Sequence, residues 1–305
     1  MVHQAVVFPG QGSQSVGMLG ELAQRYPLVT SLFAAVSERL GYDLWNLVQH
    51  GPADLLNQTM HTQVAVLTAD VVIYKLMEQR PDFSPGIMAG HSLGEYAALV
   101  CSGALELTDA AELVRTRGQL MQDTVPLGVG AMAAIVGLSD EQVVTICNQV
   151  STNTEQVTPA NYNAIGQVVI AGHARAVDKA IAAADEMNAR LAKIIPVSVP
   201  CHCPLLNQAA DQFEDALLNA NFKVPTIPVI SNVNLNIYHS VDQIRTLLKQ
   251  QLYSPVRWVE TIQLIRQKGF EFIIECGPGK VLSGLVKRID NSFQIQQACD
   301  QLLIE

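Results

Sequence analysis

Two patterns of apolar residues alternate along the chain, and each predicts a different element. Short uninterrupted apolar runs predict buried strands, whereas apolar residues that recur every three or four positions predict helices. Before residue 126, Pro27, Gly41 and Gly51-Pro52 divide a mainly helical region. The pattern there predicts strands at 4–8 and 87–89. It predicts helical segments between 18 and 80, the longest of them at 59–80. Two further helices are expected, one that follows Gly94 and runs through residue 100, and one at 108–123.

The pattern changes after Pro126. Glycines at 128 and 130 and prolines at 196 and 200 bound a segment whose predicted order is β-α-β-β-α-β. That order is the split βαβ, or ferredoxin-like, arrangement. We expect a small domain, residues 128–197, inserted into a larger domain formed by residues 1–127 and 198–305. The predicted strands are 131–136, 157–162, 167–171 and 192–197, and the predicted helices are 139–150 and 174–189.

The remaining residues return to alternating helix and strand. Such alternation indicates an α/β layer around a mainly parallel sheet. Helices are expected at 204–221, 241–252, 258–267 and 280–289, and strands at 228–230 and 271–275.

Composition narrows the class of protein. The 305 residues suffice for about two domains, and the 49% hydrophobic and 15% charged residues exclude disorder and coiled coil. No apolar run reaches about 18 residues, so no membrane span is expected. Residues 1–4 lack a basic region and no A-x-A-like cleavage site follows, so we expect a cytoplasmic protein.

Charge and cysteine usage exclude further functions. The net charge of −9 repels nucleic acid and anionic membranes, so neither is an expected partner. The six scattered cysteines predict free thiols in a cytosolic protein. Cys201-His202-Cys203 does not predict a metal site, because such close neighbours do not converge on a tetrahedral ion and no second pair follows at zinc spacing.

The segment Gly90-His91-Ser92-Leu93-Gly94 is the strongest chemical signal in the sequence. It fits G-x-S-x-G between a predicted strand and a predicted helix, which is the context of a strained nucleophilic serine. The alternative is a glycine-bracketed turn with an idle serine. A serine nucleophile needs a base. Among seven histidines we favour His202, in a proline-bounded loop ahead of a helix, over His91, which a sharp turn directs away from Ser92.

Arg117 falls on the apolar stripe of the predicted helix 108–123, with Leu113, Val114 and Met121. A cation that faces the core needs an anionic partner. That partner is either an internal Asp or Glu, or a carboxylate on the substrate held by both arms of the guanidinium.

Two glycine-rich pieces do not match phosphate-binding motifs. Gly10-Gln11-Gly12-Ser13-Gln14-Ser15 lacks the last glycine of G-x-G-x-x-G, and Gly277-Pro278-Gly279-Lys280 lacks Walker spacing. The first piece remains a loop after a strand, suited to supply a backbone N–H to an oxyanion hole.

Several segments together resemble the malonyl-CoA:acyl-carrier-protein transacylases. The resemblance runs from about residue 4 to 289 and implies an α/β-hydrolase-like large domain with a ferredoxin-like insertion. The segments that carry it are Phe8-Pro9-Gly10-Gln11-Gly12-Ser13-Gln14, Gly90-His91-Ser92-Leu93-Gly94-Glu95, Gly166-Gln167-Val168-Val169-Ile170-Ala171-Gly172, Val197-Ser198-Val199-Pro200-Cys201-His202-Cys203 and Glu275-Cys276-Gly277-Pro278-Gly279-Lys280-Val281-Leu282.

The resemblance implies a role for particular residues. Ser92 is the expected nucleophile, His202 the base, and Arg117 the ligand of the malonyl carboxylate. The remaining roles are backbone N–H groups of Gln11 and Leu93 in the oxyanion hole, the backbone carbonyl of Gln251 orienting His202, and Gln63 and Asn161 lining the acyl pocket. The chain departs from the bacterial members of the family at Cys201, where they usually have Ser, so local hydrogen bonding is expected to differ there.

The expected activity is transfer of a malonyl group from malonyl-CoA to the phosphopantetheine thiol of acyl carrier protein in fatty-acid biosynthesis. No cofactor or metal is expected, and the protein is expected to be a monomer. A basic patch of Lys280, Lys287 and Arg288 is a candidate docking surface for the carrier protein; the alternative is a solvated helix face. Three other functions stay open: a thioesterase, a non-catalytic module that binds acyl-CoA or carrier protein, and a transacylase for another acyl donor, such as methylmalonyl.

Overall fold

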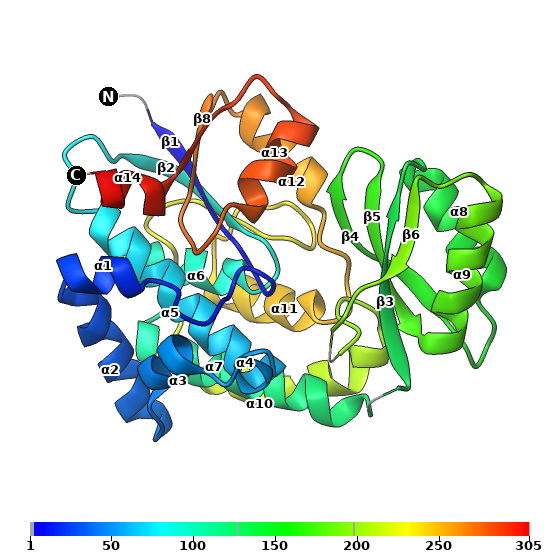
Figure 1. The fold of residues 1–305 in the computed structure, drawn as a ribbon, viewed down its shortest axis with the longest axis horizontal. Coiled ribbons are helices and arrows are strands. Elements are labelled where there is room, and N and C mark those ends of the chain that lie inside the picture. Colours follow the sequence, from blue (N-terminus) through cyan, green and yellow to red (C-terminus); the bar gives the residue numbers. More distant parts are fainter. Residues whose placement is uncertain (1–2, 127, 198, 305) are drawn as a thin grey trace.

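The computed structural model describes residues 3–126, 128–197 and 199–304. Within them the chain forms a mixed α/β fold with one parallel and one antiparallel sheet, which lie at opposite sides of the molecule in Figure 1. The parallel sheet has the strand order β7-β2-β1-β8-β9. Its strands are β1 (Gln4–Phe8), β2 (Pro85–Gly90), β7 (Val229–Ile230), β8 (Phe272–Glu275) and β9 (Gln294–Gln297).

Strand β1 is central because it is apolar on both faces. Val6 and Phe8 belong to one core cluster, which includes residues of helices α5 and α6. Ala5 and Val7 belong to a second cluster, with residues of α12 and α13. A strand buried on both faces reads as one continuous apolar run, which is how the sequence shows it.

Helices form most of the large part of the molecule. Before the antiparallel sheet these are α1 (Gly20–Arg25), α2 (Leu28–Leu40), α3 (Leu44–His50), α4 (Ala53–Leu56), α5 (Thr59–Met77), α6 (Gly94–Cys101) and α7 (Leu107–Thr124). After it come a 3₁₀ turn (Pro204–Leu206), α10 (Asn207–Asn219), α11 (Val241–Gln251), α12 (Trp258–Gln267), α13 (Val281–Ile289) and α14 (Ala298–Ile304). None of the helices among the described residues is both long and apolar enough to cross a membrane.

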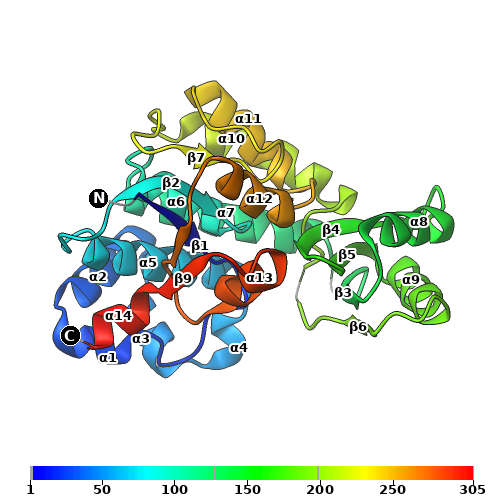
Figure 2. The same cartoon turned by 90° about the horizontal axis from the view of Figure 1, so that it is seen from above.

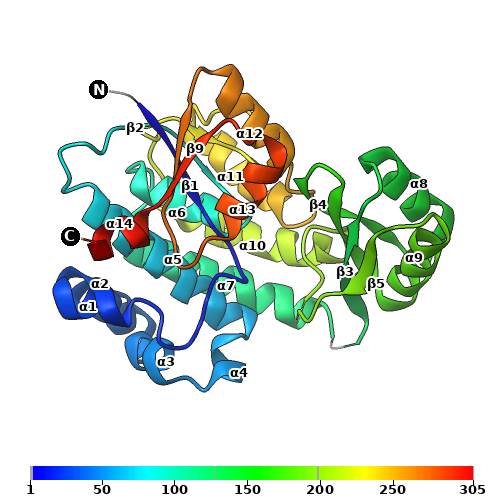
Figure 3. The ribbon, with the colours of Figure 1, turned by 45° about the horizontal axis from the view of Figure 1, so that its top comes forward.

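The antiparallel sheet has the order β4-β5-β3-β6, with helices α8 and α9 packed on one face (Figure 2). Its other face carries Met132, Ala160, Val169 and Ala171, which pack with Cys203 of the large part. Helices α12 and α13 also contact β4 (Figure 3). The elements are β3 (Gly130–Val136), α8 (Asp140–Val150), β4 (Val157–Ala164), β5 (Gln167–His173), α9 (Ala174–Glu186) and β6 (Leu191–Ile194).

The structure confirms most predicted elements but corrects several ends. Helix α7 begins at Leu107 and not at Thr108, because the main-chain N–H of Ala110 already donates to the carbonyl of Glu106 (2.9 Å). Strand β6 ends at Ile194, three residues before the predicted end, where its pairing with β3 stops. The expected helix 59–80 ends at Met77, and the expected helix 204–221 is a 3₁₀ turn followed by α10.

The C-terminal region contains two elements that the sequence pattern did not predict. Strand β9 has the sequence Gln-Ile-Gln-Gln and is only partly buried, so it lacks the apolar run of the other strands. Helix α14 follows it, and therefore α13 is not the last helix. The expected domain boundaries fall at Leu127 and Ser198, which lie outside the described residues.

Candidate active site

Ser92 lies in the sharp turn between the end of β2 and the start of α6. Its φ of 53° is left-handed, which is unusual for a residue with a side chain. A Cβ on Gly90 would overlap the main chain of Gly94, and one on Gly94 would overlap the carbonyl of Phe8. Both glycines of the motif are therefore required by the close approach of strand and helix, and the turn holds Ser92 in its strained conformation.

Asn232 fastens this turn from another segment. Its Oδ1 accepts a hydrogen bond from the main-chain N–H of Ser92 (2.7 Å), and its Nδ2 donates to the carbonyl of Gly90 (2.7 Å). The residue follows the two-residue strand β7 in a loop, so the sequence contained no signal for it. Because the Ser92 N–H is occupied, it is not free to serve as an oxyanion donor.

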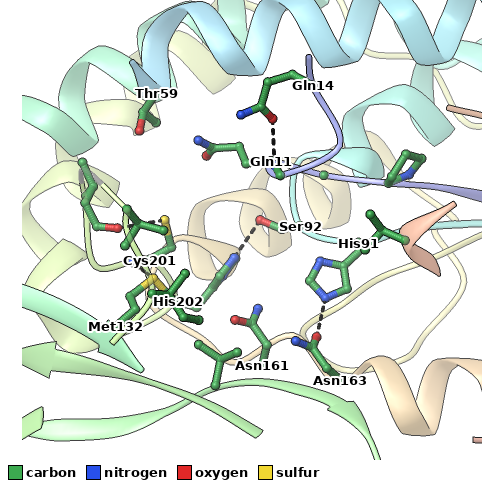
Figure 4. Close-up of a pocket in the computed structure, with 18 of the residues that line it drawn as sticks. Gln11, Gln14, Thr59, His91, Ser92, Met132, Asn161, Asn163, Cys201 and His202 are labelled. Atoms are coloured by element: carbon green, nitrogen blue, oxygen red, sulfur yellow. Dashed lines mark hydrogen bonds between the residues drawn. The ribbon is translucent and has the colours of Figure 1, made fainter. Parts of the chain in front are cut away.

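The structure brings Ser92 and His202 together, 110 positions apart in the sequence. Oγ of Ser92 lies 2.7 Å from Nε2 of His202. The dashed line between them in Figure 4 marks this contact. The other ring nitrogen, Nδ1, lies 2.8 Å from the main-chain carbonyl of Gln251. That carbonyl is an acceptor, so Nδ1 carries the proton and Nε2 is free to accept one.

The electrostatics of His202 favour the neutral imidazole. Burial and, to a smaller extent, the positive charge of Arg117 lower its pKa to about 3, although the hydrogen bond to the Gln251 carbonyl acts in the opposite direction. A neutral imidazole with a free Nε2 is the form that accepts the serine proton.

His91 is engaged elsewhere. Its Nε2 lies 2.8 Å from Oδ1 of Asn163, on the far side of the cavity from His202 (Figure 4), and its ring packs edge-on against Trp258. Of the two histidines weighed in the sequence, His202 therefore faces Ser92.

Arg117 is buried, with 1% of its surface exposed. Nη1 donates to Oε1 of Gln63 (2.9 Å), Nη2 donates to Oε1 of Gln251 (3.0 Å), and Nε has no partner. No Asp or Glu among the described residues forms a salt bridge with it. Of the two alternatives that the sequence left open, an internal carboxylate partner is therefore not found among the described residues.

Glu95 is a buried carboxylate next to the site, and no role was assigned to it from the sequence. It accepts hydrogen bonds from Tyr238 Oη (2.5 Å), Gln251 Nε2 (2.6 Å) and the main-chain N–H of Asn232 (3.3 Å). Burial raises its pKa to about 7, and these hydrogen bonds act in the opposite direction. A charged residue in the otherwise apolar helix α6 was the one available signal.

A cavity of about 510 Å³ opens beside Ser92 and His202. Gln11, Asn161 and Cys201 line it, with an apolar wall from the antiparallel sheet, from residues 195–197 and Val199, and from helix α13. Leu93 is the residue before the first turn of α6, and its buried side chain is not part of the lining. Arg117 and Gln63 are not among the residues that line it, and both are buried.

Cys201 lies next to His202, at the position where the sequence departs from the family. Its Sγ lies 3.5 Å from the carbonyl of Val199, and burial raises its pKa to about 11. The side chain is therefore a neutral thiol with a weak local hydrogen bond. All six cysteines are free of disulfides.

Lys280, Lys287 and Arg288 are exposed on and just before helix α13. The same helix contributes Val281 and Leu285 to the cavity wall, so the three cations lie on or directly before an element that borders the cavity. Nη1 of Arg288 donates to Oε1 of Gln167 (2.6 Å) on the antiparallel sheet, so this side chain is partly engaged.

A strained serine between a strand and a helix, in contact with a neutral histidine, is the arrangement of enzymes that pass an acyl group through an acyl-serine. The comparisons with known proteins identify the family within that class. The model of the family described as "Acyl transferase domain" matches residues 5–298, and the chain belongs to this family.

Relatives across the bacteria carry the same description. The malonyl CoA-acyl carrier protein transacylase of Escherichia coli (strain K12) is 49% identical over 95% of this chain and 93% of its own length. That of Bacillus subtilis (strain 168) is 40% identical over 99% and 95%. The solved structure of the malonyl CoA-acyl carrier protein transacylase from Coxiella burnetii has a TM-score of 0.97 and 47% identity, over 100% of this chain and 96% of that one.

A further solved structure shows a relative with its partner. It is described as a holo type II PKS acyl-carrier protein in complex with its malonyl-transacylase. The match has a TM-score of 0.96 and 45% identity, and covers 99% of both chains.

Proposed function

We propose that this protein transfers a malonyl group from malonyl-CoA to the phosphopantetheine thiol of acyl carrier protein, in fatty-acid biosynthesis, through a malonyl-serine on Ser92. The relatives named above are malonyl CoA-acyl carrier protein transacylases, and this chain matches each of them over nearly its whole length. The observation that carries the proposal is the 2.7 Å contact between Ser92 Oγ and His202 Nε2.

The first half of the reaction loads the serine. His202 Nε2 takes the proton of Ser92 as Oγ attacks the thioester carbonyl of malonyl-CoA. The oxyanion of the tetrahedral intermediate accepts hydrogen bonds from the N–H groups of Gln11 and Leu93. When the intermediate collapses, the C–S bond breaks, and the CoA thiol leaves with the proton that His202 had taken.

The second half repeats these steps with another thiol. His202 removes the proton from the phosphopantetheine thiol, whose sulfur attacks the ester carbonyl of malonyl-Ser92. Collapse of the second intermediate returns the proton to Ser92 Oγ and leaves the malonyl group on the carrier protein. No cofactor or metal takes part in either half.

Arg117 supplies the recognition of the malonyl group. A desolvated guanidinium without an internal carboxylate partner binds the free carboxylate of the substrate with both arms. Gln63 holds one arm, and Asn161 lines the acyl pocket. The guanidinium has to reach the cavity for this contact, which requires a shift of the side chains that now cover it.

The competing functions differ from this one in specific features. A carboxylate orienting His202 would favour a thioesterase, and the Gln251 carbonyl occupies that position instead. A module that only binds acyl-CoA has no need for a serine and a neutral histidine in contact. A methylmalonyl donor carries the same free carboxylate, so the choice between the two donors depends on the shape of the pocket.

We further propose the finer architecture and setting of the protein. The large part, residues 1–127 and 198–305, is α/β-hydrolase-like, and residues 128–197 form an inserted ferredoxin-like domain. The observed order β4-β5-β3-β6 supports the second assignment. Six cysteines without disulfides support a cytoplasmic location, and we expect a monomer. The acidic carrier protein docks on Lys280, Lys287 and Arg288, and neither nucleic acid nor a membrane is a partner.

Intact-mass measurement after mixing with different acyl-CoAs tests the function. Malonyl-CoA should add the mass of one malonyl group, peptide mapping should place it on Ser92, and holo acyl carrier protein should remove it. An adduct that water removes as fast as carrier protein does would instead indicate a thioesterase. A stronger adduct from methylmalonyl-CoA would identify a different donor.

A further inference from the structure

The carboxylate of Glu95 has no part in the steps derived above. It lies on the first turn of α6, three residues after Ser92, and is fully buried. It accepts hydrogen bonds from Tyr238, Asn232 and Gln251. The buried carboxylate of Glu95 therefore holds the groups that donate hydrogen bonds to it in place.

Its contact with Gln251 fixes which way the side-chain amide of that residue faces. Nε2 of Gln251 donates to the carbonyl of Ser92 (3.0 Å) and to Oε2 of Glu95 (2.6 Å). Both of these groups only accept, so the amide nitrogen has to face them, and Oε1 is left to face Arg117. A reversed amide would point an NH₂ group at the guanidinium, which only donates.

The guanidinium of Arg117 is oriented by this arrangement. The oxygens of Gln63 and Gln251 hold its two terminal nitrogens. The main-chain carbonyl of Gln251 holds His202, and its Nε2 holds the carbonyl of Ser92; both acyl donors need these two contacts. Its Oε1 holds Arg117, which only a donor with a free carboxylate needs. The effect on Arg117 is therefore measured by the malonyl-to-acetyl ratio and not by either rate alone.

We propose that Glu95 is a positioning residue for donor selection: by holding the side-chain amide of Gln251, it orients Arg117 toward the free carboxylate of the substrate. This inference rests on the proposed function. It assigns Glu95 an effect on the malonyl-to-acetyl ratio, which a change confined to the serine–histidine pair would leave unaltered.

The test is kcat/KM for malonyl-CoA and for acetyl-CoA in wild type and Glu95→Gln. The assay is run at pH 8, where a carboxyl with a pKa of about 7 is mostly ionised. Glutamine then keeps the shape and one oxygen but loses the charge that strengthens the hydrogen bond to Gln251. The malonyl-to-acetyl ratio should fall about fivefold to tenfold, with the acetyl value within about twofold of wild type. An unchanged ratio overturns the proposal. A higher ratio also overturns it, because that is the effect of merely removing a negative charge near Arg117.

Two further variants separate positioning from a loss of structure. Tyr238→Phe removes a hydrogen bond from the other oxygen of Glu95 at equal burial, and should leave the ratio unchanged although the protein melts at a lower temperature. An equal fall in the ratio with Tyr238→Phe would contradict the proposal. Gln251→Met keeps the main-chain carbonyl but removes the amide, so it should lower the ratio even if Glu95→Gln does not fold.

The Arg117→Ala background completes the test. If Glu95 acts through Arg117, Glu95→Gln should produce no further change of the ratio in that background. A further fall there would mean that Glu95 acts by another route. Failure of the wild type itself to load malonate on Ser92 would contradict the proposed function, which is a different result from an unaltered ratio in the variants.

Discussion

The main-chain carbonyl of Gln251 lies 2.8 Å from Nδ1 of His202, where the serine proteases have a carboxylate. A carbonyl orients the ring and fixes its tautomer, but it brings no negative charge to stabilise the imidazolium. Burial and the nearby Arg117 keep the pKa of His202 low, and the hydrogen bond to the carbonyl offsets them only in part. His202 therefore holds the proton of Ser92 only while the oxyanion of the tetrahedral intermediate exists.

Replacing Ser92 tests both the chemistry and the strain of the turn. Ser92→Ala and Ser92→Gly should both abolish malonyl loading, because each lacks the nucleophile. The glycine variant should also be more stable than the alanine variant by about 1 kcal/mol, since glycine adopts a φ of 53° without steric cost. Loading assays and thermal melting give both results. Near wild-type turnover in either variant would contradict the nucleophile assignment.

His202→Ala should slow acylation of Ser92 by the amount typical of a lost general base, roughly 10²–10⁴-fold. The rate of CoA release under single-turnover conditions measures this step. His91→Ala is the matched comparison and should have the smaller effect, because His91 contacts Asn163 and not Ser92. The opposite ranking would mean that the base has been assigned to the wrong histidine.

Arg117→Ala should reverse the preference among acyl donors. It removes the attraction for the malonyl carboxylate and also the buried cation that a neutral acyl chain leaves unpaired. Malonyl transfer should collapse, and acetyl transfer should hold or rise. Arg117→Lys should rescue malonyl transfer poorly, since it lacks the planar fork. An unaltered malonyl-to-acetyl ratio in Arg117→Ala would show that the arginine does not bind the substrate.

The low pKa of His202 also makes the stability of the fold depend on pH. Its pKa is about 3 in the folded chain and about 6.5 when unfolded, so between these values the unfolded state binds the extra proton. The contribution is complete above about pH 6.5 and is lost as the pH falls toward 3. Denaturant unfolding of wild type and His202→Asn at pH 5 and pH 8 should show it.

The difference between these two proteins should change by about 2 kcal/mol over that interval, in favour of the variant at pH 5. The raised pKa of Glu95 has the opposite sign, since its contribution is complete below about pH 4.5 and is lost as the pH rises to about 7. Both proteins contain Glu95, so it cancels in the comparison. Parallel pH profiles would show that His202 titrates normally in the folded chain.

Charge reversal of Lys287 and Arg288 should raise KM for carrier protein and leave acylation by malonyl-CoA unchanged. The effect should be largest at low salt, where surface charges are least screened. Lys223→Glu with Lys268→Glu is the matched control, because it makes the same change of net charge at exposed cations elsewhere. An equal KM for both double variants at low salt would contradict the docking site.

The amino-acid sequence by itself determined most elements and the local parts of the site. The apolar run at 4–8 predicted β1, and the two glycines around Ser92 predicted a turn that only they permit. The helical period placed Arg117 in the core, which the structure confirms. These features depend on neighbouring residues and on backbone sterics, so a local pattern contains them. A local pattern does not contain the polar strand β9, because its position follows from pairing with β8 and not from its own residues.

Only the tertiary structure decided what each functional group contacts. Ser92 and His202 are 110 positions apart, and Asn232 holds the turn of Ser92 from 140 positions away. The sequence left the partner of Arg117 open, and folding placed two amide oxygens there. Glu95 gave little signal, because what makes it matter is the set of donors that folding brings to it from residues 232, 238 and 251. Such contacts depend on how whole elements pack, and no periodicity or local spacing encodes that.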